Sequence, residues 1–306
     1  MTDIEISPTK LTRWLKVKEK RPDGYHVIKS EMVTLKYCDT LEISKGSGVT
    51  FRSDILSEEA IEVLNNLLGS NLIAKALKLI GLDRKVLVDK KIPPGGGLGG
   101  GSSNAAAILR WFIKTRHVSH ESSSFKNILM GALNLGSDIP FLVYGGRAVV
   151  GGIGEVVNPL PFLKLNILLV ISELVVSTKA VYEEFDRIKD EDVNVGSGSR
   201  SKLQKSDRMG IDNIETSNVT SEGNDLEPAA FRVERRLVEL RDFISEQTGY
   251  VPKLAGSGST FYFEESDIDP SIMGKLDHKN VHLKFKDGST SMVSFIKTST
   301  RQSELS

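Results

Sequence analysis

Six glycines in seven consecutive positions, Gly95 to Gly101, constrain this chain more than any other feature. The run follows the strand-like segment Val86–Val88 and precedes residues 104–109, which are typical of a helix interior. Glycines at a strand-to-helix junction let the backbone approach a ligand closely. They also present successive N–H groups beside the positive end of the helix. The pattern predicts a phosphate cradle, with a flexible linker as the alternative.

The predicted cradle extends slightly beyond the glycines on both sides. The hydroxyl of Ser102 or Ser103 is expected to contact a phosphate or a bound magnesium ion. The residues assigned to the cradle are Pro93, Pro94, Gly95, Gly96, Gly97, Leu98, Gly99, Gly100, Gly101, Ser102 and Ser103.

Two familiar glycine motifs fit this segment poorly. The dinucleotide-binding pattern is met formally, but the acidic residue expected about 20 positions later is Glu121, which lies in a serine cluster. The P-loop of nucleotide triphosphatases needs a lysine after its last glycine, where this chain has Ser102. A dinucleotide-dependent oxidoreductase is therefore a distant alternative.

Composition narrows the class of protein further. Lys+Arg and Asp+Glu both number 40, and this zero net charge argues against a non-specific binder of nucleic acid or of anionic membranes. No segment approaches the roughly 18 to 20 apolar residues of a membrane span, and the N-terminus lacks a signal-peptide pattern. Cys38 is the only cysteine, which excludes an intramolecular disulfide and a multi-cysteine metal site. We expect a cytoplasmic protein.

Residue periodicity predicts an α+β fold in two halves. The first 55 residues alternate short apolar pieces with turn residues, as β-structure does, and residues 57–82 have helical spacing with a break at 69–71. Residues 227–248 predict an amphipathic helical stretch. A boundary near residue 158 predicts domains 1–158 and 159–306. In the second predicted domain, we expect a strand at 165–170 and a helix at 178–188, followed by a polar loop or insert at 189–223.

A phosphate cradle without its own lysine needs a cation and a base from elsewhere in the chain. Asp138, directly before the apolar run 139–143, is a candidate for a pocket rim, although such an aspartate is also a common helix N-cap. Lys10, in an early predicted strand, is a candidate cation. A solvated lysine among basic neighbours is its alternative.

Residues 95–107, GGGLGGGSSNAAA, resemble the phosphate loop of the GHMP kinases. The triple-glycine form is similar to the members that phosphorylate 4-diphosphocytidyl-2-C-methyl-D-erythritol in non-mevalonate isoprenoid synthesis. Further segments match in the same order over roughly residues 8–263: PTKL at 8–11, RPDGYH at 21–26, NLI at 71–73, LGSDIPF at 135–141, NDLE at 224–227 and GSGS at 256–259.

The resemblance implies roles for particular residues. Asp138 would be the catalytic base, Lys10 its partner, and Tyr25 and His26 would bind the cytidine. Thr12 stands where the family usually has an asparagine near the substrate, so the contact at that position is in question.

The resemblance also implies the architecture and the reaction. We expect an N-terminal βαβ-rich domain and a ferredoxin-like C-terminal domain with the active site between them. ATP and Mg²⁺ would be the cofactors, and the partner would be the small-molecule substrate, with no nucleic acid and no membrane. A GHMP kinase for another alcohol and a catalytically silent nucleotide-binding protein are the alternatives.

Overall fold

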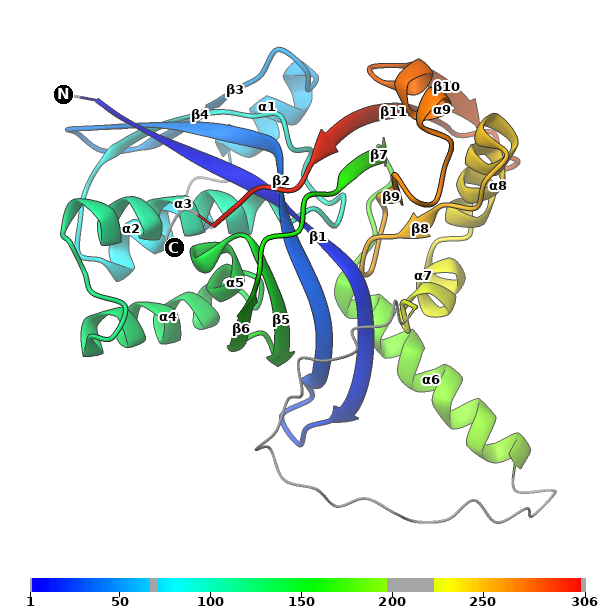
Figure 1. Ribbon diagram of the computed structural model, residues 1–306, viewed down its shortest axis with the longest axis horizontal. Helices are drawn as coiled ribbons and strands as arrows, with labels where there is room; N and C mark the ends of the chain where they lie inside the picture. Colours follow the sequence, from blue (N-terminus) through cyan, green and yellow to red (C-terminus); the bar gives the residue numbers. More distant parts are fainter. Residues whose placement is uncertain (1, 67–70, 197–222, 304–306) are drawn as a thin grey trace.

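The computed structural model describes residues 2–66, 71–196 and 223–303 (Figure 1). Of the predicted helix break at 69–71 only Asn71 is described, and residues 197–222 of the predicted insert lie outside the described ranges. Helices and strands contribute comparably to the fold, which confirms the α+β prediction.

The first sheet is built around one long antiparallel strand pair that curves across the centre of the molecule (Figure 1). β2 pairs with β1 along one edge, and with β5 and then β4 along the other. The parallel pair β3–β4 encloses a crossover that contains two helices, as predicted for a βαβ-rich half. The strands are β1 (Asp3–Lys20), β2 (His26–Ser44), β3 (Val49–Arg52), β4 (Lys85–Asp89), β5 (Arg147–Gly152) and β6 (Val156–Leu160).

Helices cover one face of this sheet because their apolar sides bury against it. The alanines of the helix after the glycine run are fully buried, and their small side chains allow it to pack closely under the strands. The helices are α1 (Glu58–Asn66), α2 (Leu72–Leu79), α3 (Gly100–Thr115), α4 (Ser123–Leu135) and α5 (Ile139–Tyr144).

The second sheet has five strands in the order β10–β11–β7–β9–β8, all antiparallel. Its core is formed by the strands and the helices that follow β7. Its strands are β7 (Asn166–Ser172), β8 (Lys253–Leu254), β9 (Phe261–Glu264), β10 (Asn280–Lys284) and β11 (Thr290–Ser299). Its helices are α6 (Thr178–Gly196), α7 (Glu227–Val233), α8 (Arg236–Thr248) and α9 (Pro270–Leu276).

The two sheets meet through a shared apolar cluster. Leu11 and Val33 of the β1–β2 pair pack with Leu169 of β7 and Tyr262 of β9, and all four are almost completely buried. The contact places the middle of β1 between the two halves, so residues of β1 can face both.

The structure corrects three details of the sequence analysis. The N-terminal β-structure consists of two long strands rather than short pieces, because β-bulges such as the one between Thr12 and Trp14 let β1 bend without ending. The helical stretch predicted over 227–248 is divided into two helices, α7 and α8. Glu234 has an extended backbone, and its carboxylate accepts the N–H of Arg236, so a new helix begins there.

The third correction concerns α6, which continues to Gly196 instead of ending at Ile188. Its apolar face ends near Ile188, but Glu191 pairs with Arg232 of α7 at 2.9 Å, and Lys189 lies over the ring of Phe185. These contacts stabilise a further stretch of largely polar helix.

Candidate active site

The glycine loop is held against both halves of the molecule at distances that only glycine permits. Gly97 and Gly99 have φ angles of +77° and +70°, which L side chains rarely adopt. A Cβ at Gly97 would overlap the carbonyl oxygen of Gly258, and one at Gly99 would lie 2.9 Å from Cγ of Lys10. Thr260 of the second sheet also donates its hydroxyl to the carbonyl of Gly96 at 2.6 Å.

The loop turns carbonyl groups toward the protein and leaves N–H groups available. The carbonyl of Leu98 accepts the backbone N–H of Lys10, and that of Gly99 accepts the N–H of Ser103. Within the described ranges, the N–H groups of Gly97 to Ser102 have no hydrogen-bond acceptor. Together with the N-terminus of α3 they form an arrangement suited to an anion.

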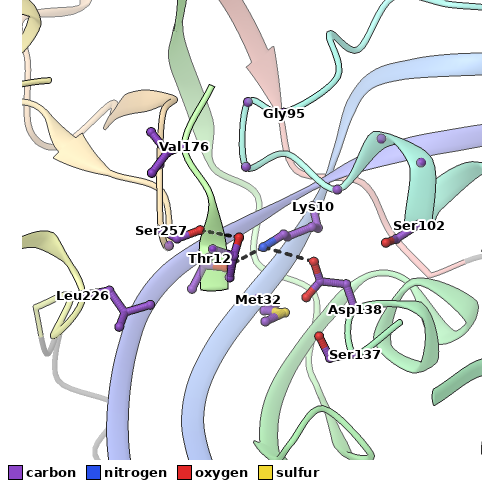
Figure 2. Close-up of a pocket in the computed structure, with 18 of the residues that line it drawn as sticks. Lys10, Thr12, Met32, Gly95, Ser102, Ser137, Asp138, Val176, Leu226 and Ser257 are labelled. Carbon is purple, nitrogen blue, oxygen red and sulfur yellow. Dashed lines mark hydrogen bonds and ion pairs between the residues drawn. The ribbon is translucent and has the colours of Figure 1, made fainter. Parts of the chain in front are cut away.

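Two of the predicted cradle residues point away from the cavity. Ser103 is buried and donates its hydroxyl to the carbonyl of Pro8 at 2.6 Å, which ties α3 to β1. Leu98 is buried in the cluster between the sheets. Ser102 faces the opposite way and lines the cavity (Figure 2). The sequence alone could not distinguish Ser102 from Ser103 as a ligand of phosphate or magnesium. The orientation of α3 places only Ser102 in the cavity wall.

Lys10 and Asp138 meet in front of the loop (Figure 2). The ammonium nitrogen of Lys10 lies 3.3 Å from Oδ2 of Asp138 and 3.4 Å from the hydroxyl of Thr12. The Lys10 side chain is 11% exposed, so it is not a solvated surface lysine. Asp138 occupies the N-cap position of α5, but its carboxylate makes no capping hydrogen bond. The carboxylate is therefore free to face the cavity.

A central cavity of about 560 Å³ joins these features. The glycine loop forms one wall, Lys10, Thr12 and Asp138 the floor, and the loop at Gly256–Gly258 the far side (Figure 2). In that loop the hydroxyl of Ser257 lies 2.9 Å from the hydroxyl of Thr178 at the start of α6. Both halves of the chain thus contribute to one cavity.

A second cavity, of about 610 Å³, lies next to the first and shares Ser137, Thr178 and Tyr182 with it. Tyr25 lines this cavity and is 60% exposed. The ring of His26 stacks on Tyr182 at 4.9 Å between ring centroids. Burial raises the pKa of the Tyr182 hydroxyl, and the negative charge of Asp138 raises it further.

Tyr182 was not found by sequence reasoning. Residues 178–188 predicted only a helix, and a tyrosine at helical spacing is usually a core residue. Tyr182 faces a cavity because α6 packs against the β1–β2 turn, and this long-range contact cannot be predicted from the residues near Tyr182.

A third, smaller pocket of about 150 Å³ shares Leu72, Pro94 and Gly101 with the central cavity. The rest of its wall combines apolar side chains with three polar ones, those of Asn71, Asn104 and the buried Lys90. Burial lowers the pKa of Lys90, although its pairing with Asp39 opposes that shift. The three hollows therefore form one row, in which the central cavity shares wall residues with each of the other two.

Within the described residues, no group of three or more His, Cys, Asp or Glu side chains is arranged to hold a metal ion, and no helix is long and apolar enough to cross a membrane.

Comparison with known proteins places this site in a family. The model of the GHMP kinases N terminal domain matches residues 59–146. The 4-diphosphocytidyl-2-C-methyl-D-erythritol kinase of Caldanaerobacter subterraneus subsp. tengcongensis is 31% identical over 280 residues, 89% of this chain and 91% of that protein. The kinase of the same name from Pseudothermotoga lettingae is 40% identical over 188 residues, 59% of this chain and 64% of that protein.

A solved structure shows the same fold. The crystal structure of a 4-(cytidine 5'-diphospho)-2C-methyl-D-erythritol kinase covers 98% of this chain with a TM-score of 0.62 at 22% identity. The glycine loop and the two-sheet architecture, together with these relatives, identify a GHMP kinase, which uses ATP to phosphorylate a small molecule. Within that class, the chain belongs to the 4-diphosphocytidyl-2-C-methyl-D-erythritol kinase family.

Proposed function

We propose that this protein transfers the γ-phosphate of ATP to the 2-hydroxyl of 4-diphosphocytidyl-2-C-methyl-D-erythritol. The observation that carries the proposal is the row of three adjoining cavities, with the Lys10–Asp138 pair in the wall of the central one. A kinase must align two elongated substrates so that a phosphoryl donor and a hydroxyl meet in line, and positioning supplies much of the rate acceleration.

ATP fits the half of the row nearest the glycine loop. The free N–H groups of the loop and the N-terminus of α3 suit the phosphates, and the small pocket beside Leu72 suits the adenine. Mg²⁺ takes oxygen ligands and is usually held by one or two protein groups together with phosphates and water. The Ser102 hydroxyl and the Asp138 carboxylate both line the cavity and would fit such an ion. When bound, the ion would neutralise phosphate charge.

The cytidine fits the second cavity. Tyr25 and Tyr182 provide aromatic surfaces for the base, and His26 provides hydrogen-bonding groups at its edge. The diphosphate and the sugar alcohol would then extend past Ser137 toward Asp138.

The Lys10–Asp138 pair fits the chemistry of the transfer. Asp138 would accept the proton of the attacking hydroxyl, since its carboxylate lines the cavity and is not used as a helix cap. Lys10 would hold the Asp138 carboxylate in place and stabilise negative charge on the transferring phosphoryl group. The hydroxyl of Thr12 would help to hold Lys10 in place.

We propose that the chain divides into two domains near residue 158, which lies within β6, the last strand of the first sheet. The strands up to Leu160 belong to the first sheet, and those from Asn166 onward belong to the second. Each sheet would then contribute one wall of the site.

Phosphate transfer from labelled ATP to the cytidyl substrate tests the function. We expect transfer by the wild type and a loss of kcat of about 10²- to 10⁴-fold in Asp138→Asn, which removes the proton acceptor with little change of shape. The exposed Asp54→Asn is the matched control and should leave kcat unchanged. Transfer to a different alcohol only would support a GHMP kinase of other specificity, and ATP binding without transfer would support the silent alternative.

A further inference from the structure

The NDLE segment at 224–227, directly before α7, connects β1 to the loop at Gly256–Gly258. The backbone N–H of Asp225 donates to the carbonyl of Leu15 at 3.0 Å. The Asp225 carboxylate accepts the N–H of Val17 and the ammonium group of Lys16, both also at 3.0 Å. These contacts fix the neighbouring Asn224 relative to β1.

The side-chain amide of Asn224 holds the loop from behind. Its Nδ2 donates one hydrogen bond to the carbonyl of Gly256 at 2.6 Å and another to the carbonyl of Leu254 at 3.1 Å. Its Oδ1 accepts the N–H of Leu226, also at 3.1 Å. Both donors and the acceptor of the amide are therefore used. A carboxylate of the same size could not replace it, because it has no donor.

The Gly256 end of the loop lies against the floor of the central cavity. A Cβ added to Gly256 would be 3.7 Å from the hydroxyl of Thr12 and 4.0 Å from the ammonium nitrogen of Lys10. Ser257, the next residue, lines the cavity beside Thr12 (Figure 2). The far end of the loop is held by other contacts, such as the hydrogen bond from Thr260 to the glycine loop. The amide therefore acts on the end that faces Lys10.

The same hydrogen bond also orients a backbone donor. In a trans peptide the carbonyl and the following N–H point in opposite directions. Because Asn224 binds the Gly256 carbonyl, the N–H of Ser257 points away from Asn224, on the side where Ser257 borders the cavity. Among the residues that the structure describes, no group accepts this N–H. It is therefore a donor for the oxygens of a ligand.

We propose that Asn224 is a positioning residue of the kinase reaction. Its amide fixes the peptide between Gly256 and Ser257, and through it both the Ser257 N–H and the contact of the loop with Lys10 and Thr12. The inference rests on the proposed phosphoryl transfer and adds a residue outside the central cavity on which the geometry of the transfer depends. A displacement of about 1 Å in a reacting geometry can cost about 100-fold in rate.

The test compares two changes of Asn224 with a change of its neighbour. Asn224→Asp keeps an acceptor for the N–H of Leu226, but while ionised it has no donor for the two carbonyl groups. Asn224→Ala removes all three hydrogen bonds without adding a charge. Asp225→Asn is the matched control, because it keeps an acceptor for the N–H of Val17 and its side chain makes no hydrogen bond to the loop. Phosphate transfer gives kcat and KM, and hydrogen exchange at Ala255 and Gly258, whose N–H groups are hydrogen-bonded within the loop, reports its order.

At a pH of about 8, we expect kcat to fall at least about tenfold in Asn224→Asp and in Asn224→Ala. KM for ATP should stay within about threefold of wild type, because the contacts at the far end of the loop are retained. The two N–H groups of the loop should exchange faster in both variants. Asp225→Asn should match the wild type in kcat, KM and exchange.

The pH profile separates a lost donor from a general loss of structure. Two carbonyl oxygens disfavour the ionised form of the acid introduced by Asn224→Asp, and protonation gives it back one donor. Its kcat relative to wild type at the same pH should therefore rise as the pH falls toward about 5.5. The same ratio for Asn224→Ala should stay constant.

Wild-type kcat in a folded Asn224→Ala protein, unchanged exchange of the loop, or a flat pH ratio for Asn224→Asp would overturn the inference. An equal loss of kcat in Asp225→Asn would do the same, since it would show that the whole segment matters rather than the amide. If the wild type transfers phosphate to no alcohol, the proposed function fails. The exchange rates alone then decide the inference, because they need no turnover.

Discussion

Lys10 and Asp138 illustrate how single side chains acquire their chemistry from surroundings. Lys10 is one of many basic residues on β1, yet it alone points at the glycine loop, packed against Gly99 and 3.3 Å from Asp138. Thr12 is the second oxygen within reach of its ammonium group. The amide usual at that position is replaced by a hydroxyl, which still accepts a hydrogen bond from Lys10.

At the residue scale, we expect Lys10→Met to lower kcat by about 10²- to 10³-fold, because the transition state loses a cation aimed at developing charge. Steady-state phosphate transfer measures the effect. The control is Lys18→Met, an exposed lysine of the same strand, which should retain wild-type kcat. Comparable losses in both variants would contradict a specific role for Lys10.

The glycine loop is the element on which the proposed ATP site depends. Its shape is determined by contacts with both sheets, through the carbonyl of Gly258 on one side and the side chain of Lys10 on the other. An added methyl group would displace the loop from these contacts and therefore move the N–H groups that face the cavity.

At the element scale, we predict that Gly97→Ala raises KM for ATP at least about tenfold, since an uncompensated clash of about 1–3 kcal/mol must be relieved by moving the loop. Gly288→Ala is the matched control: Gly288 also has a positive φ, but a Cβ added there would meet no atom within 4 Å. Both variants share the backbone strain, so KM for ATP should rise only in Gly97→Ala. A similar rise in both would mean that strain alone is responsible.

The whole molecule is held together behind the active site by a buried charge network. Arg13, the extra residue of a bulge in β1, makes a bidentate contact of 2.8 Å to Glu264 of β9 and a second contact to Glu31 of β2. Glu31 also accepts hydrogen bonds from Trp14 and Arg147. The network joins the two sheets just beyond Thr12, so it sets the relative position of the walls of the cavity.

At the scale of the whole molecule, Arg13→Met should lower the free energy of unfolding by about 3–5 kcal/mol, because the buried Glu264 loses its bidentate partner and Glu31 loses one of its two arginines. Denaturant unfolding measures the change. The same substitution at Arg52, whose pair with Glu42 is solvent-exposed, should cost only about 0–1 kcal/mol. Equal costs would show that the Arg13 network does not stabilise the fold.

Glu31 also predicts how stability responds to acid. Burial acts to raise its pKa, but the hydrogen bonds from Arg147 and Arg13 outweigh it, and the pKa lies below the ordinary 4.5. As the pH falls through 4.5, the unfolded chain takes up a proton before the folded one, so stability is lost below that pH. Unfolding curves over a pH series should show a shallower acid loss for Glu31→Gln than for wild type. Parallel curves would refute this.

The class of this protein and the location of its phosphate loop could be predicted from the order of its residues alone. The strand–glycine–helix order around Gly97 depends on backbone preferences of neighbouring residues, and such local preferences can be predicted from the chain alone. The motifs around Lys10, Tyr25 and Asp138 follow one another along the chain in a fixed order. That order predicted the family, and the relatives confirm it.

Only the tertiary structure decided which side chains meet. That Ser102 faces the cavity while Ser103 is buried depends on how α3 rotates against β1. That Tyr182 and Asp186 surround His26 depends on where α6 crosses the β1–β2 turn. Long-range side-chain partners follow from sheet register, bulges and helix packing, and these are set by the burial of the whole core rather than by any short segment.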